Sequence, residues 1–146
     1  MTEFIDLPLP APDDRSARAA SLRSRDAVHR GDKEGWLALF ADDALVQDPV
    51  GVSPLDETGL GHRGKEAIAA FWDTVIGPNK VGMELRASHA GGDEVANVLR
   101  ISTTLGDGSR VEGELVALYK VRPSDGLIES LRAFWEFDKL ELIPPS

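Results

Sequence analysis

The chain has 146 residues and a mass of 15.8 kDa, which suits a single domain with one hydrophobic core. Its 16 Lys and Arg residues against 25 Asp and Glu residues give a formal net charge of −9, which disfavours nucleic acids and anionic membranes as partners. The absence of cysteine excludes disulfide bonds, a thiol nucleophile and cysteine-ligated metals. No apolar run reaches the roughly 18 residues of a membrane span, and the acidic start is unlike a signal peptide. We therefore expect a cytoplasmic protein.

The first part of the chain predicts an arm followed by a helix. Residues 1–12 contain three prolines and predict an extended arm, which leaves residues 13–146 as a single domain. The helix should begin near Asp13 or Asp14, which can cap free N–H groups, and should end at Gly31. Small and apolar residues repeat at helical spacing and should form its buried stripe: Ala17, Ala20, Ser24, Ala27 and Val28.

Two further helices and a strand are expected next. A short helix follows Asp32, and the segment ALVQDPV then alternates like a strand, with Ala44, Val46, Asp48 and Val50 on one face. Residues 51–63 read as a loop, and about 64–77 as a third helix.

Four strand-like runs complete the chain, at about 82–90, 94–104, 110–122 and 127–139. The turn sequences between them favour hairpins. One face of the first run should carry Met83, Leu85, Ala87 and His89. Arg100 should point outward, away from Leu99 and Ile101. Helices followed by antiparallel strands predict an α+β fold, in which helices cover one face of a curved sheet and enclose a cavity.

Asp48 is the candidate for chemistry, because a carboxylate shares a face with apolar neighbours. Burial of a carboxylate without partners is costly. Desolvation would raise its pKa toward the range in which it can take and return a proton. A structural role, in which Asp48 caps a turn, explains the pattern as well, and periodicity alone leaves both interpretations open.

Three segments resemble the bacterial ketosteroid isomerase family of the nuclear transport factor 2-like, or SnoaL-like, superfamily. They are GDKEGWLALFADDALVQDPVG, GKEAIAAFWDTVI and LIESLRAFWEFD, within about residues 14–139. The resemblance implies a cone of three helices against a strongly bent mixed sheet, no cofactor and a homodimer formed through the outer sheet face. No metal is expected either, because the three histidines are scattered and lack the spacing of metal ligands. It also implies that an apolar small molecule binds in the cone.

The resemblance places the family's proton-shuttling aspartate on Asp48. The family's oxyanion tyrosine falls on Ser24, and its protonated aspartic acid falls on Ala117, so both usual oxyanion donors are replaced. Tyr119, on the same face as Ala117, could offer a hydroxyl from another angle, and Trp135 an indole N–H. The remaining positions expected to contact substrate are apolar: Val28, Phe40, Phe71 and Ala133.

Three functions remain open. The first is a cofactor-independent isomerase of a steroid-like or other apolar carbonyl compound, with Asp48 moving a proton alpha to the carbonyl. The second is a polyketide cyclase or epoxide hydrolase on the same fold; the outward parity of Arg100 argues against the Asp-Arg-Asp arrangement of the hydrolases. The third is a binding module for an apolar ligand without catalysis, which the missing donors favour.

Overall fold

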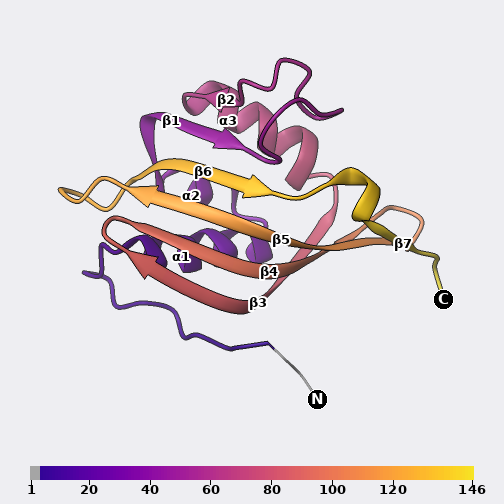
Figure 1. The fold of residues 1–146 in the computed structure, drawn as a ribbon, viewed down its shortest axis with the longest axis horizontal. Coiled ribbons are helices and arrows are strands. Elements are labelled where there is room, and N and C mark those ends of the chain that lie inside the picture. The colour runs from indigo at the N-terminus through magenta and orange to yellow at the C-terminus, as the bar shows by residue number, and fades with distance from the viewer. Residues whose placement is uncertain (1–3) are drawn as a thin grey trace.

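The computed structural model describes residues 4–146, in which helices pack on a curved, mixed, mostly antiparallel sheet (Figure 1). The helical elements are α1 (Ala17–Arg30), α2 (Lys33–Leu37), α3 (Lys65–Phe71), the π-helical turn η1 (Trp72–Ile76) and the 3-10 turn η2 (Phe137–Lys139). The strands are β1 (Phe40–Gln47), β2 (His62–Arg63), β3 (Lys80–Gly91), β4 (Glu94–Thr104), β5 (Arg110–Val121), β6 (Ile128–Phe134) and β7 (Glu141–Ile143). The expected α+β class is confirmed, although the third helix is shorter than predicted and continues as η1.

The strand order of the sheet is β2-β1-β6-β5-β4-β3, and β7 pairs with β5. Strand β1 runs parallel to β6, and the other neighbours are antiparallel. Helix α1 packs on β3, β4 and β5, while α3 packs on β1 and β2. In the view of Figure 1 the first two helices lie behind the sheet. The apolar core therefore lies between the helices and one face of the sheet.

The N-terminal arm passes along β3 in Figure 1, and the Ile5 amide donates to the Leu85 carbonyl at 2.7 Å. Residues 4–12 form no helix or strand, and the first three residues of the predicted arm lie outside the described part. Within residues 4–146, no helix is long and apolar enough to cross a membrane.

Helix α1 begins later than the sequence predicts. Its N-cap is Ser16, whose hydroxyl accepts from the Ala19 amide at 3.1 Å, and not Asp13 or Asp14. The Asp14 carboxylate instead accepts from the Ser16 amide, before the helix. The predicted end at Gly31 is confirmed: this residue has a φ of 66°, a left-handed conformation that glycine adopts without steric strain. The predicted stripe is buried throughout.

The predicted face of β3 is wrong beyond Leu85. The register shifts between Leu85 and Ala87, so Leu85 pairs with Leu99 and Ala87 with Val98. This bulge inserts one extra residue and reverses the faces of the following ones. Ser88 consequently points to α1, where it accepts from Arg18 at 3.0 Å, and His89 is exposed.

The last predicted strand also ends earlier, because β6 stops at Phe134. The chain then turns through η2 and returns as β7, which pairs with the start of β5. Within the predicted loop at 51–63, His62 pairs with Val46 as part of β2. This pairing needs Gly61, whose φ is 84° and where a Cβ atom would come within 2.9 Å of the Val46 carbonyl oxygen.

Candidate active site

Asp48 follows the last residue of β1, at the inner face of the sheet. Pairing of β1 with β6 sets Val46 beside Leu131, and the Val50 amide donates to the Ala133 carbonyl at 2.9 Å, so the chain on both sides of Asp48 is fixed. The Asp48–Pro49 peptide bond is cis. Trp135, just beyond β6, donates its indole N–H to Oδ1 of Asp48 at 2.5 Å.

The surroundings of Asp48 favour its neutral form. Desolvation raises the pKa of the Asp48 carboxyl above its usual range, while the Trp135 hydrogen bond and the charge of His62 lower it in part. The residue is half-buried and keeps some access to solvent. A carboxyl in this position can take a proton from a bound molecule and return it, because the charged form is not strongly stabilised.

Asp48 stands where two cavities meet. The inner chamber, of about 90 Å³, lies between the helices and the sheet, and the outer chamber, of about 330 Å³, opens beside it. Five residues line both chambers: Asp48, Val75, Ile101, Thr103 and Leu115. Apolar side chains make up most of both walls. Together the chambers fall within the roughly 300–1,000 Å³ typical of small-molecule sites.

The structure brings together most of the residues that the sequence predicts for the site. The inner chamber is lined by Asp48 and by six of the predicted contact residues: Ser24, Val28, Phe71, Ala117, Tyr119 and Ala133. Trp135 lines the outer chamber. Phe40 lines neither chamber, because it is buried behind Trp36, with ring centroids 4.6 Å apart.

A chain of buried polar groups closes the inner chamber. The indole N–H of Trp36 donates to Ser24 Oγ at 3.0 Å, and Ser24 Oγ lies 2.9 Å from Tyr119 Oη in a further hydrogen bond. Burial, with a smaller contribution from the Asp48 charge, raises the pKa of Tyr119 to about 12 against the lowering effect of the Ser24 bond. The tyrosine is therefore a protonated hydroxyl at neutral pH.

Two neighbours of the site were missed by the sequence-based reasoning. Trp36 had no predicted role in the site, yet it lines the inner chamber and donates a hydrogen bond to Ser24. His62, which lies in β2 opposite Val46, was expected in a loop. The glycines on both sides of His62 favoured a turn, and no periodicity marks a strand of two residues.

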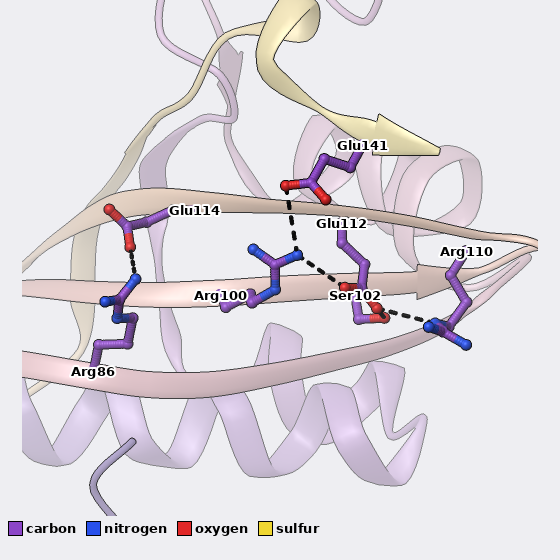
Figure 2. A network of polar contacts seen from close by, with 7 residues as sticks. All are labelled: Arg86, Arg100, Ser102, Arg110, Glu112, Glu114 and Glu141. Carbon is purple, nitrogen blue, oxygen red and sulfur yellow. Dashed lines mark hydrogen bonds and ion pairs between the residues drawn. The ribbon is translucent and has the colours of Figure 1, made fainter. Parts of the chain in front are cut away.

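A separate, more open hollow of about 590 Å³ lies on the opposite side of the sheet, and Arg100, Glu114 and Glu141 are among its lining residues. Figure 2 shows the ion pairs there: Arg100 lies 2.9 Å from Glu112 and 3.9 Å from Glu141, and Arg86 pairs with Glu114. Hydrogen bonds from Arg100 and Arg110 lower the pKa of Glu112. The outward position predicted for Arg100 is confirmed, so its guanidinium is bound to glutamates away from Asp48.

No group of three or more His, Asp or Glu side chains is arranged to hold a metal ion in the described range 4–146. The polar groups at the inner chamber are instead a carboxyl, three hydroxyls and one indole N–H group, from Asp48, Ser24, Thr103, Tyr119 and Trp36. Trp135 donates a second indole N–H to Asp48 from the outer chamber. This set can exchange a proton and donate hydrogen bonds to an otherwise apolar molecule.

Residues 22–131 match the model of a SnoaL-like domain, and the chain belongs to this family of the nuclear transport factor 2-like superfamily. It is 36% identical over 118 residues to a steroid Delta-isomerase of Nocardioides simplex, an alignment that covers 81% of this chain and 88% of that protein. The crystal structure of the Delta 5-3-ketosteroid isomerase from Mycobacterium sp. is similar, with a TM-score of 0.82, 41% identity and coverage of 86% of this chain and 97% of that one.

A further similar structure is RV0760c from Mycobacterium tuberculosis in complex with estradiol-17beta-hemisuccinate. The TM-score is 0.80, the identity is 36%, and the match covers 86% of this chain and 97% of that chain. The expected resemblance to ketosteroid isomerases is thereby confirmed at the level of family and fold.

Proposed function

We propose that the protein is a cofactor-independent isomerase of an apolar carbonyl compound of the 3-oxo-Δ5-steroid class, with Asp48 as the proton shuttle. The observation that carries this proposal is a half-buried carboxyl at the junction of two mostly apolar chambers, where burial raises its pKa. Similarity to steroid isomerases at 36% and 41% identity supports the same reaction.

The reaction moves one proton and leaves the composition of the substrate unchanged. The Asp48 carboxylate takes a proton from the carbon between the carbonyl and the double bond, and the C–H electron pair moves toward the carbonyl to form a dienolate. Protonated Asp48 then returns this proton to the far end of the former double bond. The enolate oxygen regains its carbonyl, and the double bond ends in conjugation with it.

The position of Asp48 suits both proton transfers. A ligand whose carbonyl end occupies the inner chamber and whose body fills the outer chamber passes Asp48 at their junction. One carboxyl group can then reach both carbon atoms, which lie two bonds apart, without a movement of the chain. The raised pKa of Asp48 brings it closer to that of an enol, which eases the transfer in both directions.

An epoxide hydrolase of the Asp-Arg-Asp type is not supported. That chemistry needs an arginine in the cavity, and Arg100 lies on the outer face of the sheet, where it pairs with Glu112 (Figure 2).

A homodimer formed through the outer sheet face is part of the same proposal. Apolar side chains lie on that face among the charges, including Val116, Leu118 and Phe134, of which Phe134 is 42% exposed. Sedimentation equilibrium should give twice the monomer mass, and Phe134→Glu should give a monomer. A monomeric wild type at high concentration would contradict this part.

The test of the activity is the conversion of a 3-oxo-Δ5-steroid, followed by the ultraviolet absorbance of the conjugated product. We expect Asp48→Asn to lower kcat by about 10²–10⁴-fold, the usual contribution of a positioned general base. The matched control is Asp42→Asn, which changes an exposed aspartate of β1 and should keep the wild-type rate. Equal rates of wild type and Asp48→Asn would overturn the proposal, and saturable steroid binding without turnover would indicate a binding module.

A further inference from the structure

Three side chains at the inner chamber form one hydrogen-bonded series. Trp36, Ser24 and Tyr119 come from α2, α1 and β5, and each is at least 94% buried, with exposures of 1%, 1% and 6%. The distances are 3.0 Å from Trp36 Nε1 to Ser24 Oγ and 2.9 Å from Ser24 Oγ to Tyr119 Oη. All three residues line the chamber that contains Asp48.

The chemistry of the three groups fixes the donor at one end of the series. An indole N–H can only donate, so Trp36 occupies an acceptor position of Ser24. Either hydroxyl can donate in the bond between Ser24 and Tyr119, and when Ser24 donates, its one hydrogen is used. The free hydrogen is then that of the Tyr119 hydroxyl, at the wall of the chamber. Groups that donate in series polarise one another, which strengthens the last donor.

The size of the inner chamber decides which part of a ligand meets this donor. A volume of about 90 Å³ corresponds to roughly three water molecules, at about 30 Å³ each. Only one end of a large ligand fits, while its body must lie in the outer chamber. Because most of the chamber wall is apolar, the polar end of the ligand belongs beside a hydrogen-bond donor, and the Tyr119 hydroxyl supplies one.

We propose that Tyr119 donates a hydrogen bond to the carbonyl oxygen of the bound ligand, and that Ser24 and Trp36 are positioning residues that orient its hydroxyl. The inference rests on the proposed function, for which it supplies the stabilisation of the negative charge that develops on the oxygen. Because Tyr119 and Asp48 line the same chamber, one group holds the oxygen while the other moves the proton.

The experiment compares Tyr119→Phe and Ser24→Ala with the wild type. The matched control is Ser21→Ala, which removes a buried serine of the same helix that bonds Asn97 and lies outside both chambers. We expect Tyr119→Phe to lower kcat by about 10²–10³-fold with little change in KM, as for the loss of one oxyanion donor. Ser24→Ala should lower kcat by about 3–10-fold, the effect of one weakened hydrogen bond, and Ser21→Ala should not change it.

The infrared carbonyl frequency of a bound ketone does not depend on turnover, so its measurement separates this inference from the proposed function. In difference infrared spectra of a bound 3-oxo-Δ4-steroid, the carbonyl stretch should lie at lower frequency in the wild type than in Tyr119→Phe. This shift supports Tyr119 as the donor even if no isomerisation occurs. Identical frequencies in the two proteins, or no saturable binding of the ketone, would overturn the inference, even if Asp48→Asn abolishes turnover.

If Tyr119→Phe loses its near-ultraviolet circular dichroism and is therefore not folded, the test is the comparison of Ser24→Ala with its control, Ser21→Ala. A carbonyl frequency raised in Ser24→Ala but not in Ser21→Ala upholds the inference, and equal frequencies overturn it.

Discussion

The indole Nε1 of Trp135 lies 2.5 Å from Oδ1 of Asp48 and donates a hydrogen bond to it. This bond joins the end of β1 to the segment after β6, two parts of the chain brought together by the parallel pairing of these strands. The bond orients the carboxyl and opposes the effect of desolvation on its pKa. The bond and desolvation thus act in opposite directions on the pKa of Asp48.

Trp135→Phe should move the acid limb of the pH profile of kcat/KM to higher pH. The hydrogen bond stabilises the charged carboxylate, so its loss raises the pKa of Asp48 further, and the base is ionised only at higher pH. Trp72→Phe is the matched control, since Trp72 is buried against Trp36 and lines neither chamber. An unchanged acid limb in Trp135→Phe would show that the bond does not tune the base.

Asp48→Asn should be more stable than the wild type at neutral pH. Folding raises the pKa of Asp48, so the stability contributed by this group is present below its unfolded pKa, about 3.9, and is lost as the pH rises through the folded value. Asparagine carries no charge, and the variant does not incur this loss. Thermal unfolding at several pH values should give a higher Tm for the variant near pH 7 and a difference that shrinks toward pH 4. A lower Tm for the variant at neutral pH would mean that the charged form is stabilised by folding.

Leu115→Trp should block ligand binding while the fold is retained. Leu115 lines both chambers, and an indole at their junction would fill the passage between them. The strain of the larger side chain should cost about 1–3 kcal/mol in the free energy of unfolding. Lys120→Trp is the control on the same strand, because Lys120 is exposed on the opposite face of the sheet. Titration with a steroid should show at least tenfold weaker binding only for Leu115→Trp, and equal affinities would place the ligand elsewhere.

Local patterns predicted the elements of the fold more accurately than their ends. Gly31 has no side chain to oppose a left-handed φ, and this local property fixes the end of α1. The start of the same helix depended on a competition between Asp14 and Ser16, in which the aspartate accepts from the serine amide instead of capping the helix. Such competition involves several groups at once, and composition alone does not resolve it.

The bulge in β3 and the short β7 depend on pairing between distant segments. Alternation predicted His89 on the inner face, but the register shift after Leu85 puts it outside. The extra residue is accommodated through the partner strand β4, so the β3 sequence carries no signal for it. Strand β7 has three residues, and its pairing with β5 could not be read from so short a segment.

Only part of the candidate site was predicted, because several of its contacts also join segments that are far apart in the sequence. The position of Asp48 followed from a period of two and from the family resemblance, both of which are local in sequence. Its bond with Trp135 and the contact between Ser24 and Tyr119 join residues 87 and 95 positions apart. These contacts depend on how β1, β5 and β6 are arranged in the sheet, which determines where each hydroxyl and indole points.

The central claim is that Asp48 is an acid whose proton affinity is raised by its surroundings, and its titration measures this directly. Carbon-13 NMR of aspartate side-chain carboxyls follows each group with pH, and the signal missing from Asp48→Asn identifies the one of interest. We expect this carboxyl to titrate above the ordinary value of about 3.9. Titration at or below that value would contradict the account.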